Sequence, residues 1–133
     1  MKYMLDTNIC IYTIKHKPET VIRNLLLHDS EEMCISSITY GDLMHGVEKS
    51  AAAGKNRIAL SLFLSPLTIL DFSASAAEEY GKIRAELESR GMPIGPMDLL
   101  IAGHAKSEGL ILVANNTKEF LRVEGLAVEN WAE

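Results

Sequence analysis

Residues 110–113 read Leu-Ile-Leu-Val, and this run without a polar side chain constrains the fold most. A strand that is apolar at every position is typical of a parallel sheet covered on both faces. Short strands are also expected at 2–5, 33–36 and 67–70, and a last one near 127–129. Helical patterns lie between these segments. Strands that alternate with helices favour a parallel α/β sheet in one domain, here residues 1–133.

The helices are expected from their apolar spacing and their end signals. The clearest spans 73–90, because apolar residues recur there at positions 76, 80, 83 and 87. The turn 6–8 is expected to cap a helix at 9–15, and Pro96 to begin a helix that runs to Glu108. A helix from Ser37 or Thr39 to about 53 is expected to end at Gly54. Other helices are expected at 19–27, at 56–64 and, briefly, through 120.

Composition limits the classes of protein to consider. No segment has the roughly 20 apolar residues that a membrane-spanning helix needs, because Pro66 interrupts the longest uncharged stretch, 58–70. The amino terminus does not have the pattern of a secretory signal, so we expect a cytoplasmic protein with no membrane partner. Cys10 and Cys34 lie in apolar surroundings without a C-x-x-C spacing, so we expect buried, reduced thiols.

The formal net charge of −5 argues against a protein that holds nucleic acid through a broad positive field. It does not exclude a nuclease, because the carboxylates of a nuclease site contribute to such a charge and bound cations reverse it locally. The same charge also suits a protein that has a basic partner.

Three aspartates lie where a fold tolerates a carboxylate poorly. Asp6 closes the first strand, Asp42 lies inside a helical pattern, and Asp98 lies in the first turn of a very apolar helix. An isolated buried carboxylate is strongly destabilising unless it is paired, hydrogen-bonded or bound to metal. In open α/β sheets, ligands collect beyond the carboxyl ends of the strands, where Asp6 and the pair Asn115-Asn116 fall. If the three aspartates meet in space, a divalent cation explains them best.

Each aspartate taken singly has a structural explanation. Asp6 suits the N-cap of a helix, and Asp42 suits a solvated face that it shares with His45 and Gly46. Asp98 lies near a helix N-terminus, where the helix dipole favours a carboxylate by about 0.3–1 kcal/mol. That gain is smaller than the cost of burying an unpaired carboxylate, so the dipole alone does not account for Asp98.

Motifs of several other enzyme classes are missing. The four histidines, at 16, 28, 45 and 104, have no zinc-site spacing, and we expect His104 to be a hydrogen-bonded structural residue. There is no G-x-S-x-G, Walker A or G-x-G-x-x-G pattern. An aspartyl phosphotransferase with Asp6 as nucleophile is another enzyme class that an Asp after the first strand would suit. That family would have a second Asp where Asn8 stands.

Four stretches carry a resemblance to a known family. They are MLDTNI at 4–9, SSITYGDLMHG at 36–46, PIGPMDLLIAGHA at 93–105 and NNTKEF at 115–120. In this order, across nearly the whole chain, they resemble the PIN-domain ribonucleases, specifically the VapC-type toxins of bacterial toxin–antitoxin pairs. The resemblance implies a PIN-like three-layer α/β/α domain with a mostly parallel central sheet. It also implies acidic side chains that bind Mg²⁺, or Mn²⁺ as a substitute, for the hydrolysis of RNA.

By position, the resemblance makes Asp6 and Asp98 metal ligands and places Asp42 where the family usually has Glu. Asp42 is shorter than Glu by one methylene, about 1.5 Å of reach, so ligation through a water molecule is expected, which Mg²⁺ tolerates. Asn116 falls on the fourth acidic position of many PIN domains, and Glu119, one helical turn later, is expected to replace or support it.

The resemblance also implies supporting residues and partners. Thr7, Asn8 and Asn115 would orient the first carboxylate and its water network, as outer residues do at metal sites. The substrate would be transfer RNA, with the anticodon region of the initiator tRNA as one target. A VapB-type antitoxin would neutralise the toxin, a homodimer would form within a larger toxin–antitoxin assembly, and operator DNA would be bound only through the antitoxin. The alternative is a catalytically weakened PIN fold that mainly binds antitoxin or RNA, suggested by Asp42, Ala114 and Asn116.

Overall fold

Five parallel strands form the centre of the molecule in the order β3-β2-β1-β4-β5. In the computed structural model, which describes all 133 residues, these are β1 (Tyr3–Leu5), β2 (Met33–Ser36), β3 (Thr68–Leu70), β4 (Ile111–Ala114) and β5 (Val128–Asn130). Tyr3 of β1 pairs with Met33 on one side and with Ile111 on the other. All five strands are parallel, so the expectation of a mostly parallel sheet is confirmed in a stricter form.

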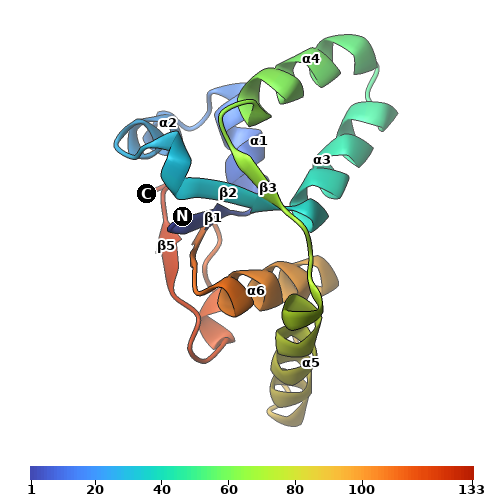
Figure 1. The fold of residues 1–133 in the computed structure, drawn as a ribbon, viewed down its shortest axis with the longest axis vertical. Coiled ribbons are helices and arrows are strands. Elements are labelled where there is room, and N and C mark those ends of the chain that lie inside the picture. The colour runs from blue at the N-terminus through green and yellow to red at the C-terminus, as the bar shows by residue number, and fades with distance from the viewer.

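Six α-helices and two short 3-10 helices connect the strands. They are α1 (Thr7–Lys15), α2 (Glu19–Leu26), α3 (Ser37–Lys49), α4 (Ala53–Leu64), α5 (Ala74–Ser89), α6 (Pro96–Glu108), η1 (Ser30–Glu32) and η2 (Phe120–Arg122). Figure 1 shows α1 to α4 on one side of the sheet and α5 and α6 on the other, which makes three layers. No helix of the chain combines the length and the apolar character needed to cross a membrane.

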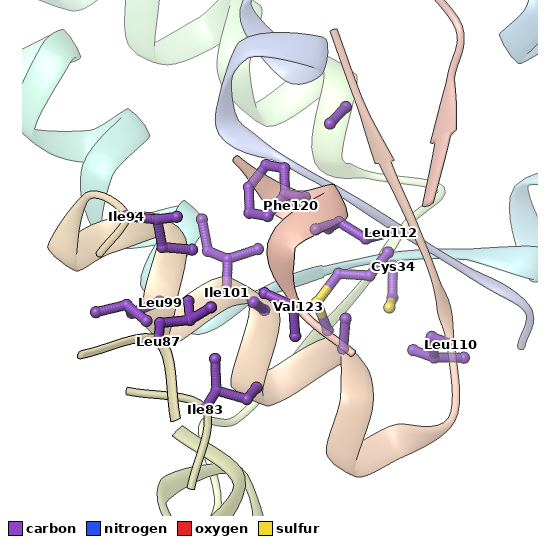
Figure 2. Close-up of a cluster of buried hydrophobic side chains, with 14 residues drawn as sticks. Cys34, Ile83, Leu87, Ile94, Leu99, Ile101, Leu110, Leu112, Phe120 and Val123 are labelled. Atoms are coloured by element: carbon purple, nitrogen blue, oxygen red, sulfur yellow. The ribbon is translucent and has the colours of Figure 1, made fainter. Parts of the chain in front are cut away.

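The strands divide their side chains between two apolar cores. In β1, Tyr3 and Leu5 face the core under α1 to α4, while Met4 faces the core under α5 and α6. Because both faces are covered, every β1 residue is buried, as a parallel sheet requires. Figure 2 shows the second core, in which Leu99 and Ile101 of α6 meet side chains from α5, β4 and η2.

Helix α6 lies unusually close to α5. An ideal Cβ at Gly103 would stand 2.8 Å from the backbone nitrogen of Tyr80 and 2.9 Å from its Cα. Only glycine fits such an approach, so the backbone of α6 itself packs on α5 at this point. This contact fixes the depth at which α6 lies in the fold, and α6 carries Asp98.

One expected helix end is wrong. Gly54 does not end a helix but lies in the first turn of α4, and α3 ends earlier, at Lys49. Ser50 closes α3 instead, since its hydroxyl donates to the carbonyl of Val47 and accepts a hydrogen bond from Asn56. Helix α4 begins three residues before the expected 56, the other expected elements begin and end within about two residues of the expected positions, and the α6 bounds agree at both ends.

Candidate active site

The topology brings several acidic residues to one edge of the sheet. The strand order runs from β1 through β2 to β3 in one direction, and β4 and β5 lie on the opposite side of β1. The carboxyl ends of β1 and β4 therefore meet where the order reverses, which is where open α/β sheets bind ligands. Asp6 follows β1 directly, and the segment after β4 carries Glu119.

Asp6 is both a helix cap and a buried acid. Its carboxylate accepts a hydrogen bond from the backbone N–H of Ile9 at 3.0 Å and caps α1, so the structural explanation of Asp6 is correct. It is nevertheless only 5% exposed. Burial raises the pKa of Asp6 to about 6, against the opposing effect of hydrogen bonds from the amides of Ile9 and Asn8. The cap alone therefore leaves the charge of Asp6 poorly compensated.

Asp98 and Glu119 form a carboxyl pair beside Asp6. Burial, a hydrogen bond to Glu119 and the negative charges of Glu119 and Asp6 raise the pKa of Asp98 to about 7. The two carboxyl groups flank Gly95: an ideal Cβ at that glycine would lie 3.5 Å from Oδ2 of Asp98 and 4.0 Å from Oε2 of Glu119. Two carboxylates in contact must share a proton or hold a cation between them.

The loop that carries Glu119 is held in place from two directions. Phe120 of η2 is buried in the core under α5 and α6 (Figure 2). Arg122 donates a hydrogen bond of 3.1 Å to the carbonyl of Pro93, in the turn that precedes Asp98. Arg90 donates a further one to the carbonyl of Arg122 at 2.6 Å. These contacts set the position of Glu119 against the start of α6.

Asp42 comes from a third element, α3. It is half-buried on α3 and lines a cavity of about 350 Å³ between α1, α3 and α4, together with Lys15, Leu43 and Leu60 among others. The negative charges that act on Asp98 come from Glu119 and Asp6, and Asp42 is not among them. The fold therefore brings Asp98 and Glu119 into contact with Asp6 near them, and Asp42 lies on the neighbouring helix α3.

The polar residues expected to support the site differ in their surroundings. Thr7 donates a weak hydrogen bond of 3.4 Å to the hydroxyl of Thr39, and Asn8 is exposed. Asn115 donates to the hydroxyl of Tyr12 at 2.9 Å, while its Oδ1 is buried without a partner. Asn116 is exposed.

Sequence reasoning missed Gly95 and Tyr12 as parts of the site. Gly95 had a signal, because it directly precedes Pro96 at the helix start. Tyr12 had none, since its contact with Asn115 joins positions 103 residues apart.

Two expectations about buried polar groups are confirmed. Cys10 and Cys34 are buried free thiols. His104 is fully buried, and its Nδ1 lies 2.7 Å from the hydroxyl of Ser36, so it is a hydrogen-bonded structural residue.

The donor chemistry of the site suits a hard divalent cation. Asp6, Asp98 and Glu119 offer only carboxylate oxygens, which Mg²⁺ and Mn²⁺ prefer, and no cationic side chain is paired with them in an ion pair. As the side chains lie, no three His, Cys, Asp or Glu residues close around one point. The fit rests on the Asp98–Glu119 pair, whose charge is uncompensated once both groups are ionised.

Known proteins resemble this chain over nearly its whole length. The PIN domain family matches residues 3–126. The tRNA(fMet)-specific endonuclease VapC of Shigella flexneri is 51% identical over 132 residues, which is 99% of each chain. Among solved structures, DNA-bound VapBC from Salmonella typhimurium matches with a TM-score of 0.92 and 49% identity over 98% of both chains. VapBC2 from Rickettsia felis, bound to a promoter DNA fragment, matches with a TM-score of 0.91 and 47% identity over 98% of this chain and 99% of that one.

These matches span the same stretches that carry Asp6, Asp98 and Glu119. The fold, the family match and relatives at about half identity over almost the full length agree with one another. This chain belongs to the PIN-domain family and, within it, to the VapC group.

Proposed function

We propose that this chain is a metal-dependent endoribonuclease toxin that hydrolyses phosphodiester bonds in RNA and is neutralised by a VapB-type antitoxin. The observation that carries the proposal is the carboxyl pair of Asp98 and Glu119 beside buried Asp6 at the edge of a parallel sheet. Acidic groups placed so that they raise one another's proton affinity are typical of functional sites. The VapC relatives are named as ribonucleases, which supports the same activity here.

Asp6, Asp98 and Glu119 would hold Mg²⁺, with Mn²⁺ as a substitute, and Asp42 would contribute through a water molecule. When bound, the cation lowers the pKa of a water molecule and offsets the negative charge that develops on the phosphate. Asp6 is held in one orientation by the amide of Ile9. Glu119 would replace the acidic group missing at the exposed Asn116, and its hydrogen bond to Asp98 supports this role. Thr7 and Asn8, at the start of α1, and Asn115, directly after β4, would support these groups.

Transfer RNA is the substrate that the relatives favour. The VapC of Shigella flexneri is named as specific for tRNA(fMet), so the initiator tRNA, cut in its anticodon region, is the first substrate to test. The related VapBC structures contain an antitoxin and DNA. We extend this assembly to the present chain as a cytoplasmic homodimer that binds operator DNA only through its antitoxin. A negatively charged site also suits a basic segment of such a partner.

The test compares the purified chain with three charge-removing variants on initiator tRNA in Mg²⁺. Asp6→Asn, Asp98→Asn and Glu119→Gln keep the size of each side chain, and Asn keeps the cap at position 6. Each is expected to lower the cleavage rate by at least about 100-fold, because each removes charge needed to hold the cation. Asp29→Asn is the matched control, since Asp29 is exposed and its side chain makes no cap hydrogen bond.

Mn²⁺ binding, measured without RNA, separates the two possible functions. If wild type binds Mn²⁺ and all three variants lose both Mn²⁺ binding and RNA cleavage, the nuclease function is supported. Binding of RNA and antitoxin without cleavage or Mn²⁺ binding would instead support the catalytically weakened fold. Cleavage that persists in Asp6→Asn and Asp98→Asn would exclude these residues from the reaction.

A further inference from the structure

Buried polar side chains are few in this protein, and most of them meet at one place. Five polar or charged residues are buried: Asp6, Thr13, Ser36, Thr39 and His104. Three of them, Ser36, Thr39 and His104, are fully buried where the end of β2, the start of α3 and the middle of α6 come together. An apolar core does not require a polar cluster here, so the cluster needs an explanation of its own.

His104 joins α6 to the start of α3 through Ser36. The imidazole Nδ1 lies 2.7 Å from the hydroxyl of Ser36. The same hydroxyl accepts a hydrogen bond of 3.0 Å from the amide of Ile38 and so caps α3. Ser36 is also the last residue of β2, the strand that lies beside β1. One hydroxyl thus connects α6, α3 and the edge of the sheet where Asp6 stands.

Stability alone does not favour this arrangement. Nε2 of His104 is buried and makes no well-aligned hydrogen bond, although the backbone of Asp71 lies near the ring, and the ring packs edge-on against Phe72 at 5.4 Å between centroids. Burial lowers the pKa of His104, against the opposing effects of Glu108 and of the backbone and charge of Asp71. A buried ring with one poorly bonded nitrogen contributes less to stability than its size suggests. What His104 adds is its hydrogen bond to Ser36, a contact that has a fixed direction.

That contact acts on the helix that carries Asp98. Residues 103 and 104 are neighbours on α6, and their directions differ by about 100° around the helix axis. Gly103 fixes α6 against α5, and His104 fixes it against Ser36. Two anchors in different directions set both the depth and the rotation of α6. Asp98 lies on the same rigid helix, about 9 Å along the axis from His104 at 1.5 Å per residue.

We propose that His104 is a positioning residue, whose hydrogen bond to Ser36 sets the rotation of α6 and thereby holds Asp98 against Glu119 and Asp6 for cation binding. The inference rests on the proposed function, because it assigns the cation to these carboxylates. His104 itself touches neither the cation nor the substrate in this proposal. Its role is to hold the carboxyl groups of Asp98 and Glu119 near Asp6 at the edge of the sheet.

The test measures Mn²⁺ affinity by electron paramagnetic resonance in the full-length chain. His104→Leu and Ser36→Ala are each expected to weaken Mn²⁺ binding about tenfold, the lower end of the effect of outer residues at metal sites. The double variant should bind no more weakly than Ser36→Ala alone, because Ser36→Ala already removes the contact with His104 as well as the cap of α3. Thr13→Val is the matched control: Thr13 is also buried, but its hydroxyl bonds only to the carbonyl of Ile9 within α1.

Further readouts separate positioning from loss of stability. In chelator, His104→Leu should unfold at the same urea concentration as wild type or at a higher one. With RNA, kcat should fall while KM stays within about twofold of wild type. His104→Asn, whose amide nitrogen falls near the position of Nδ1, should recover most of the Mn²⁺ affinity. His104→Gln, whose amide falls near Nε2, should not.

The outcomes distinguish this inference from the proposed function. If wild type does not bind Mn²⁺, or Asp98→Asn binds it equally well, both proposals fail. If Asp98→Asn loses the ion while His104→Leu and Ser36→Ala bind it like wild type, only the positioning role fails. Should His104→Leu not fold, the contrast between His104→Asn and His104→Gln decides, and equal affinities for these two overturn the inference.

Discussion

At residue 6, one carboxylate serves two purposes that oppose each other. As the cap of α1 it is fixed by the amide of Ile9, and as a buried acid its pKa rises from 3.8 to about 6. A cap of this kind works equally well as Asn. The charge is therefore not needed for the helix, and the fold retains it at a cost in stability that a cation at the site would offset.

Metal-free stability should fall as pH rises. Asp6 and Asp98 have folded-state pKa values of about 6 and about 7, above their ordinary value of 3.8. Between about pH 4 and pH 7 the folded chain therefore binds more protons than the unfolded chain, and the free energy of unfolding decreases as pH rises. Asp6 alone accounts for about 3 kcal/mol, and half-buried Asp98 adds a smaller amount.

Urea unfolding in chelator at pH 5 and pH 8 measures this loss. Asp6→Asn, which keeps the cap, should be more stable than wild type at pH 8 and should show a flatter pH dependence. Saturating Mn²⁺ should also flatten the wild-type curve, because a cation holds the carboxylates ionised. A wild-type stability that is constant or increases between pH 5 and pH 8 would contradict the assignment of these pKa values.

Lengthening the side chain at position 42 should increase activity. Asp42 lines the cavity between α1, α3 and α4, and the charges that raise the pKa of Asp98 come from Glu119 and Asp6. Asp42→Glu adds about 1.5 Å of reach and should convert ligation through water into direct ligation. We expect tighter Mn²⁺ binding and faster RNA cleavage, by about 3- to 30-fold, or 0.7–2 kcal/mol. Unchanged affinity and rate would mean that side-chain length at this position is unimportant.

Gly95 should be required for the cation and not for folding. A methyl group there would lie 3.5 Å from Oδ2 of Asp98 and 4.0 Å from Oε2 of Glu119, which is ordinary contact. Gly95→Ala should therefore lower the free energy of unfolding by no more than about 1 kcal/mol, the cost of Ala at the N-cap of α6, yet weaken Mn²⁺ binding several-fold by displacing water from the carboxylates. Gly54→Ala, in open space on α4, is the control. Equal Mn²⁺ affinities in the two variants would contradict this role for Gly95.

At the scale of elements, the contact between α5 and α6 determines where Asp98 stands. Gly103→Ala would place a methyl group 2.8 Å from the backbone nitrogen of Tyr80, so the two helices must separate. Overpacking of this kind costs about 1–3 kcal/mol. Gly81→Ala on α5 has no neighbour within 4 Å and should instead stabilise the chain by up to about 1 kcal/mol. Thermal unfolding of both variants tests the contact, and equal stabilities would rule out close packing at Gly103.

The sequence predicts the bounds of α6, but it does not predict the contact between Asp98 of α6 and Glu119. Pro96 and Gly109 mark the two ends of α6 by local chemistry, so its bounds follow from the sequence. The contact of Glu119 with Asp98 depends on Phe120 entering a core built from α5, α6 and β4, and no local signal encodes that. The end of α3 cannot be predicted from Gly54 either, because the hydrogen bonds of Ser50 set it.

At the scale of the whole molecule, the charge opposes the proposed substrate. The chain has a formal net charge of −5, and the proposed site is itself acidic, so RNA is repelled from it until cations bind. Most proteins that hold nucleic acid bind it more tightly as salt is lowered, because they release counterions. Here the repulsion at the site acts against that trend, and divalent cations become necessary for substrate binding as well as for hydrolysis.

RNA affinity in chelator should therefore increase when the site loses charge. The double variant Asp6→Asn/Asp98→Asn is expected to bind a labelled anticodon stem-loop more tightly than wild type at 50 mM KCl, by about three- to tenfold, or 0.7–1.4 kcal/mol. The difference should shrink at 200 mM KCl, where the Debye length is shorter and repulsion is screened. Fluorescence anisotropy at both salt concentrations measures it, and Asp29→Asn controls for charge removed at an exposed site away from the proposed one. If the double variant binds no better than Asp29→Asn, the RNA does not approach these carboxylates, and the cleavage site must lie elsewhere on the molecule.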